Sequence, residues 1–89
     1  KVLDGPVSLF YKNGQAEWRN TYYRGLLHGL STKWDISGQK IREGYFNNGD
    51  SSGVWFWWNI NGELIGKKSF NNTLLKNNGL NNYQMKLNK

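Results

Sequence analysis

Glycine residues recur at a fixed interval of 24 positions along most of this chain. Three glycine columns keep the interval: Gly5, Gly29 and Gly53; Gly14, Gly38 and Gly62; and Gly25 with Gly49. Other columns keep it too: Phe10, Trp34 and Trp58; Tyr22, Phe46 and Phe70; and Gln15, Gln39 and Glu63. A fixed period of this length is typical of a repeated supersecondary unit. We therefore expect three copies of one unit.

Each unit has the pattern of a β-hairpin. Asn13-Gly14, Ser37-Gly38 and Asn61-Gly62 each separate two runs of β-forming residues, such as "PVSLFY" and "QAEWRNTY" around the first. Asn-Gly favours a type I′ turn, in which both central residues have positive φ. The glycine pairs 25/29 and 49/53 are expected to bound the connections between hairpins, with His28 in the first connection.

These patterns predict an all-β domain of consecutive antiparallel hairpins. The three units would span residues 5–28, 29–52 and 53–72. Residues 73–89 form a basic, Asn-rich tail, which we interpret as a degenerate fourth repeat or a cap on the last hairpin.

Alternation along the first strand of each hairpin separates two faces. One face carries the aromatic column Phe10, Trp34 and Trp58, and we interpret this constant face as the packed one. The other face varies from apolar to polar to aromatic between units, which favours a specific role there. We predict that its residues Trp55 and Trp57, supported by Tyr11, bind a partner. The alternative is a second core layer, in which Leu74, Leu75 and Leu80 cover the two Trp rings.

The repeat resembles the MORN repeat, and more closely the bacterial variant found in YwqK-like antitoxins. The matching stretches are "GPVSLFYKNGQ", "GLSTKWDISGQ" and "GVWFWWNINGE", followed by "YYRG", "YFNNG" and "FNN". The resemblance covers residues 5–72. It implies hairpins stacked edge to edge into an elongated, twisted antiparallel sheet, with a non-enzymatic role in binding proteins or, in some members, lipid surfaces.

The residues available for catalysis or metal binding are few. The chain has no Cys and one histidine, His28, for which a surface position is the simplest interpretation. The six acidic residues do not recur in columns, whereas paired carboxylates would have to share a cleft. We therefore expect no enzymatic activity, no cofactor and no metal site.

The positive charge is concentrated toward the C-terminal end. The net charge is +6, and the last five Lys residues, from Lys67 onward, have no acidic neighbour in that stretch. The nearly balanced body disfavours nucleic-acid binding. Lysines without an apolar anchor bind a membrane surface only weakly, at about 1 kcal/mol each. A protein partner is therefore favoured over nucleic acid or membrane.

The sequence thus predicts a non-enzymatic MORN-like module that mediates protein–protein interaction through the variable aromatic face or an open sheet edge. One alternative is an antitoxin or immunity protein that neutralises a partner toxin. Another is a fragment of a surface or secreted repeat protein, because the chain begins with Lys rather than Met. Both a cytoplasmic location, slightly favoured, and a secreted or surface location are compatible with the sequence, which does not define the oligomeric state.

Overall fold

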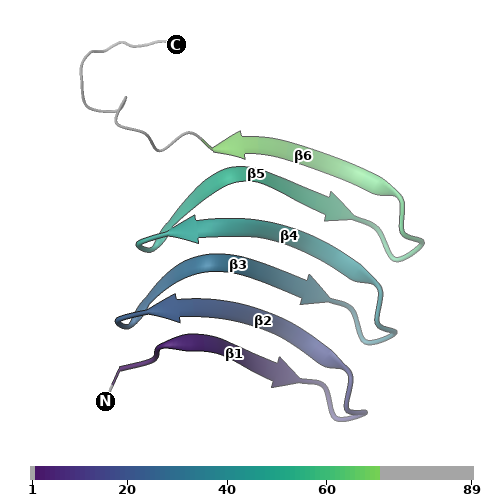
Figure 1. Ribbon diagram of the computed structural model, residues 1–89. Coiled ribbons are helices and arrows are strands. Elements are labelled where there is room, and N and C mark those ends of the chain that lie inside the picture. Colours follow the sequence, from purple (N-terminus) through teal and green to yellow (C-terminus); the bar gives the residue numbers. More distant parts are fainter. Residues whose placement is uncertain (1, 71–89) are drawn as a thin grey trace.

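The fold is a single antiparallel sheet of six strands in sequential order (Figure 1). The computed structural model describes residues 2–70, so the tail at 73–89 and its Leu74, Leu75 and Leu80 lie outside the described residues. The strands are β1 (Gly5–Phe10), β2 (Ala16–Tyr23), β3 (Leu26–Trp34), β4 (Lys40–Asn47), β5 (Asp50–Trp58) and β6 (Leu64–Phe70). The prediction of an all-β fold of consecutive hairpins is confirmed.

The 24-residue interval of the sequence is also present in the strand boundaries. Strands β1, β3 and β5 end at Phe10, Trp34 and Trp58, whereas β2, β4 and β6 begin at Ala16, Lys40 and Leu64. Each hairpin carries a register shift next to its turn, between Leu9 and Phe10 in the first case. The expected unit boundaries at residues 29 and 53 fall inside β3 and β5, because these strands begin three residues earlier than the glycines.

The turns inside the hairpins differ from the predicted type I′. The Gly14 N–H donates to the Tyr11 carbonyl at 3.0 Å, and the Tyr11 N–H donates to the Gln15 carbonyl at 2.8 Å. Gly14 has a φ of 91°, whereas Asn13 is not among the residues with positive φ. A three-residue loop that ends in a left-handed glycine and a bulge has this pattern. The type I′ prediction at Asn13-Gly14 was wrong, because the loop is one residue longer than that turn allows.

Consecutive positive φ angles occur instead at the connections between hairpins. Arg24 and Gly25 have φ of 52° and 86°, and Asn48 and Gly49 have φ of 50° and 92°. Two left-handed residues in succession are what a type I′ turn requires. The connections are therefore tight two-residue turns rather than segments that extend to Gly29 and Gly53.

The tight connections are bonded to the preceding hairpin. The Gly49 N–H donates to the Leu27 carbonyl at 2.8 Å. The Asn48 N–H donates to Nδ1 of His28 at 3.1 Å. His28 thus lies within β3, half-buried, and not in a connector as the sequence analysis expected. Its ring accepts a hydrogen bond that helps to hold the next turn.

The recurring Gln column explains how neighbouring hairpin turns stack. A Cβ atom at Gly38 would lie 3.1 Å from Oε1 of Gln15, and one at Gly62 would lie 3.2 Å from Oε1 of Gln39. Each Gln amide also donates to the next residue's carbonyl, as Gln39 does to Lys40 at 2.7 Å. The glycine that the turn needs for its positive φ therefore also makes room for the preceding unit's Gln.

The sheet is a single layer, and its most buried side chains are few. The smallest dimension of the molecule is 11 Å. Trp55 is 4% exposed, and Ser31 and Thr32 are 1% and 4% exposed. Phe10 is 59% exposed, whereas Trp34 and Trp58 of the same column are half-buried, so the constant face is packed at only some of its positions. Burial is concentrated around β3 to β5. Within residues 2–70 the fold contains no helix that could span a membrane.

Candidate functional site

One row of side chains crosses all six strands on a single face of the sheet. Register pairs connect its members in the order Leu9, Trp18, Lys33, Arg42, Trp57 and Gly66. We name this side the Trp57 face, and the opposite side, which carries Trp34 and Trp58, the Trp58 face. Alternation also places Trp55, two residues before Trp57, on the Trp57 face. The structure therefore brings the two predicted Trp residues together.

Trp55 forms the centre of an aromatic cluster on the Trp57 face. Its ring centroid lies 5.1 Å from that of Phe46 and 6.1 Å from that of Phe70, both in edge-to-face geometry. Its Nε1–H donates to the Tyr45 carbonyl at 3.1 Å. The ring lies directly over Gly44, where an added Cβ would approach it closer than 3.0 Å. With 4% of its surface exposed, Trp55 offers a partner little area, and its visible role is to pack this face.

Trp57 is the more accessible of the two predicted Trp residues. It is half-buried and stacks beside Trp55, with the ring centroids 6.2 Å apart and the planes 29° apart. Its ring leaves room over Gly66, where an added Cβ would meet Cε3 at 3.4 Å, an ordinary contact distance. Trp57 therefore packs against the buried Trp55 ring and still has exposed surface that a partner could contact, which suits an interaction hot spot.

Arg42 lies next to the two Trp rings. Its guanidinium carbon is 5.8 Å from the Trp55 ring centroid, within cation–π range. Its Nε is buried and has no hydrogen-bond partner among the described residues. The two ion pairs within residues 2–70 join Lys33 to Glu17 and Lys40 to Glu43, so neither neutralises Arg42. The Trp57 face thus holds a cation whose charge this part of the chain does not compensate.

Tyr11 has a different environment from the two Trp residues. It follows β1, four strands away from β5, and its hydroxyl donates to the Trp34 carbonyl at 2.9 Å. Partial burial raises the pKa of the Tyr11 hydroxyl, as do the negative charges of Glu17 and Asp35. The structure does not bring Tyr11 together with Trp57. Its observed contact joins the first hairpin to the second.

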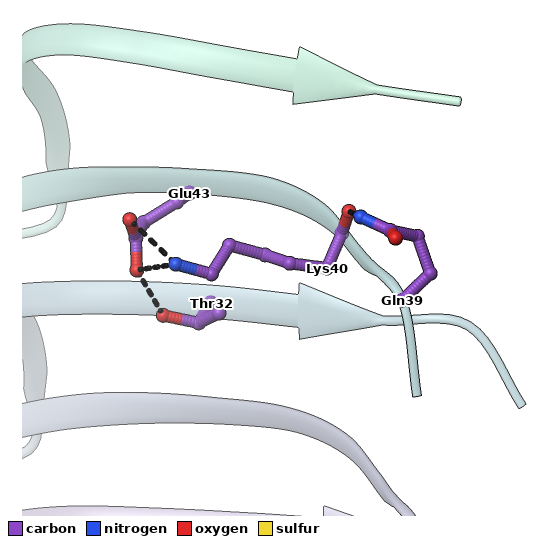
Figure 2. A network of polar contacts seen from close by, with 4 residues as sticks. All are labelled: Thr32, Gln39, Lys40 and Glu43. Carbon is purple, nitrogen blue, oxygen red and sulfur yellow. Dashed lines mark hydrogen bonds and ion pairs between the residues drawn. The ribbon is translucent and has the colours of Figure 1, made fainter. Parts of the chain in front are cut away.

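The cation beside Trp58 on the Trp58 face, Lys40, is paired with a carboxylate. Figure 2 shows Lys40 extending along β4 to the Glu43 carboxylate, with both oxygens 3.2 Å from Nζ. Thr32 on β3 donates to the same carboxylate at 3.1 Å. Lys40 Nζ also lies 5.7 Å from the Trp58 ring centroid. These groups satisfy one another, which leaves this network with little to offer a charged ligand.

Sequence reasoning did not single out Arg42, Gly44 or Lys68 as parts of this face. The 24-residue column of Asn20, Gly44 and Lys68 could have indicated the close packing at Gly44, because a glycine inside a strand pattern often marks close approach of another group. The acidic residues give no comparable site. Among the described residues, no group of three His, Cys, Asp or Glu side chains is arranged to hold a metal ion.

Comparison of this chain with protein-family models, with curated proteins and with solved structures found no match.

Proposed function

We propose that this chain is a non-enzymatic MORN-like repeat module that binds another protein through its Trp57 face. One observation carries the proposal: half-buried Trp57 and charge-uncompensated Arg42 lie side by side in one row of the sheet. Rings that gain contact area at little entropic cost, and Arg side chains, are the groups most enriched at interaction hot spots. The resemblance of residues 5–72 to MORN repeats supports a binding role.

A contrast between the surroundings of Trp57 and Trp58 supports the choice of surface. Beside Trp58, the cation Lys40 is neutralised by Glu43, and Thr32 completes the network. On the Trp57 face, Trp55 is fixed by neighbouring rings and Trp57 is held beside it. A prearranged ring loses little freedom on binding, so more of its contact energy remains as affinity.

The test is capture of a partner from a lysate of the source cells with the chain as bait, together with two variants. Trp57→Ala should reduce capture by about 30-fold or more, the effect of losing a hot-spot ring of about 2 kcal/mol. Trp58→Ala is the matched control, because Trp58 is the adjacent half-buried Trp on the opposite face. Proteins retained by Trp58→Ala and lost with Trp57→Ala support the proposal.

Urea denaturation of both variants separates binding from folding. If Trp57→Ala lowers the free energy of unfolding by about 3–5 kcal/mol, as truncation of a core ring does, Trp57 is a core residue. That result would favour the second-core-layer alternative over the proposed interface. Equal capture by both variants would exclude the Trp57 face as the binding surface.

A further inference from the structure

The positive charges of the Trp57 face flank its aromatic cluster on both sides. Arg42 is on β4 and pairs with Trp57, whereas Lys68 is on β6 and pairs with Trp55. Strand β5, which carries both Trp rings, lies between β4 and β6 in the sheet (Figure 1). A ligand that covers the two rings therefore meets a cation at either side.

Neither of these two cations has a carboxylate partner within residues 2–70. The two ion pairs of this region use Lys33 and Lys40 instead. Each of the two cations lies over an aromatic ring instead. The Arg42 guanidinium carbon is 5.8 Å from the Trp55 ring centroid, and Lys68 Nζ is 4.9 Å from the Phe70 ring centroid. A cation held over a ring keeps its capacity to bind an anion, and its position is restricted before the anion arrives.

We infer that the partner of the Trp57 face presents an acidic protein segment, whose carboxylates bind Arg42 and Lys68 while an apolar side chain packs on Trp57. This inference rests on the proposed function and defines the chemistry of the partner. The guanidinium of Arg42 suits a carboxylate because its planar array of donors can bind both oxygens. Its buried Nε directs such contact to the terminal nitrogens.

The arrangement fits a carboxylate-bearing peptide better than a nucleic acid. Single-stranded nucleic acids need successive open rings for stacking and a continuous basic groove for the phosphates. Here Trp55 is 4% exposed, so on the Trp57 face of β5 no open Trp lies next to Trp57. The third cation of the face, Lys33, is already paired with the Glu17 carboxylate at 3.8 Å, so it does not extend Arg42 and Lys68 into a continuous basic groove. The face therefore favours a peptide with a few separate carboxylate contacts over a continuous nucleic-acid strand.

The inference is tested by titrating the full chain with poly-L-glutamate and measuring the change in Trp fluorescence. Lys68→Gln should raise the dissociation constant about two- to fivefold, as loss of one exposed ion pair does. Lys67→Gln is the matched control, because Lys67 is the adjacent exposed Lys and pairs with Phe56 on the Trp58 face. It should leave the dissociation constant unchanged.

A second pair of variants tests the Arg residue. Arg42→Gln should raise the dissociation constant at least about tenfold, the effect of losing hydrogen bonds between charged groups. Arg19→Gln is its control, because Arg19 is exposed and pairs with Ser8 and Thr32 on the opposite face. If Arg42→Gln proves unstable, the Lys68 and Lys67 pair still decides the question, since both of these side chains are exposed.

Three results would overturn the inference. Equal weakening by Lys67→Gln and Lys68→Gln would show unspecific attraction to a basic chain. Tighter binding of oligothymidylate, with the same dependence on Arg42 and Lys68, would identify a nucleic-acid surface. If a captured partner depends on Trp57 but binds Arg42→Gln and Lys68→Gln normally, the proposed function stands and the acidic segment is wrong.

Discussion

The close approach of Trp55 to Gly44 predicts that Gly44→Ala strongly destabilises the fold. The new Cβ would lie closer than 3.0 Å to the Trp55 ring, whereas carbon atoms pack at about 3.5–4.0 Å. The ring cannot move aside easily, because Phe46 and Phe70 contact it and its Nε1–H is bonded to the Tyr45 carbonyl. The substitution must therefore displace a packed cluster.

The expected loss can be estimated from the two interactions that the displacement affects. Overpacking of a well-filled site costs about 1–3 kcal/mol, and loss of the Trp55 Nε1–H bond adds about 0.5–1.5 kcal/mol. A total of about 2–4 kcal/mol is large for a chain of this size, whose whole stability is of the order of 4–13 kcal/mol at typical values per residue. The melting temperature should fall by roughly 10–30 °C.

Gly66→Ala provides the matched control. Gly66 lies under Trp57 in the same way that Gly44 lies under Trp55, but its added Cβ would meet the ring at 3.4 Å. Neither glycine has positive φ, so Ala introduces no backbone strain at either position. Gly66→Ala should keep or slightly raise stability, by up to about 1 kcal/mol, because Ala restricts the unfolded chain.

Urea and thermal denaturation of both variants, followed by circular dichroism, measure the difference. In a Trp55→Leu background, Gly44→Ala should cost at least about 1 kcal/mol less than in the native chain, because the clashing ring is absent. Equal stability of Gly44→Ala and Gly66→Ala, or the same cost in both backgrounds, would refute the close packing of Trp55 on Gly44.

Two further predictions concern the turns. Tyr11→Phe removes the hydrogen bond to the Trp34 carbonyl and should lower the melting temperature modestly, measured by differential scanning calorimetry; an unchanged value would remove Tyr11 from the contact between hairpins. The Asp35 carboxylate accepts hydrogen bonds from the Ser37 hydroxyl and from the N–H groups of Ser37 and Gln39, which lowers its pKa. The stabilisation of the fold by the ionised Asp35 carboxylate should be complete above the ordinary Asp pKa of about 3.9. It should disappear as the pH falls through the lowered pKa of Asp35. Asp35→Asn should keep the turn and abolish this acid-dependent loss of stability. Urea denaturation between pH 2 and 6, roughly the span over which Asp residues titrate, measures the effect. A pH profile unaltered by the substitution would assign the loss of stability to other groups.

Much of the fold could be predicted because strand and turn signals recur in every unit. The position of each hairpin turn followed from its glycine, such as Gly14 or Gly38, and both do adopt positive φ. The turn type did not follow, because it depends on how many residues the bulged register leaves unpaired. The same dipeptide Asn-Gly adopts different conformations at 13–14 and 48–49, since only Asn48 is left-handed.

The most buried ring could not be predicted from the aromatic columns. Phe10 belongs to an all-aromatic column yet is 59% exposed, whereas Trp55 interrupts its column and is 4% exposed. The burial of Trp55 depends on the absence of a side chain at Gly44 on the neighbouring strand. Such a pair is not a property of either column alone, and it becomes visible only when the strand register is known.

Part of the cohesion between hairpins lies at the turns, which has a consequence for function. The Gln15 amide fills the space over Gly38, and the Asn48 N–H is bonded to His28. These contacts and the backbone ladder hold a one-layer sheet without requiring particular side chains at every position of the Trp57 face. Lys68, which is exposed, is therefore expected to be replaceable with little effect on folding, so the effect of its replacement reports on binding.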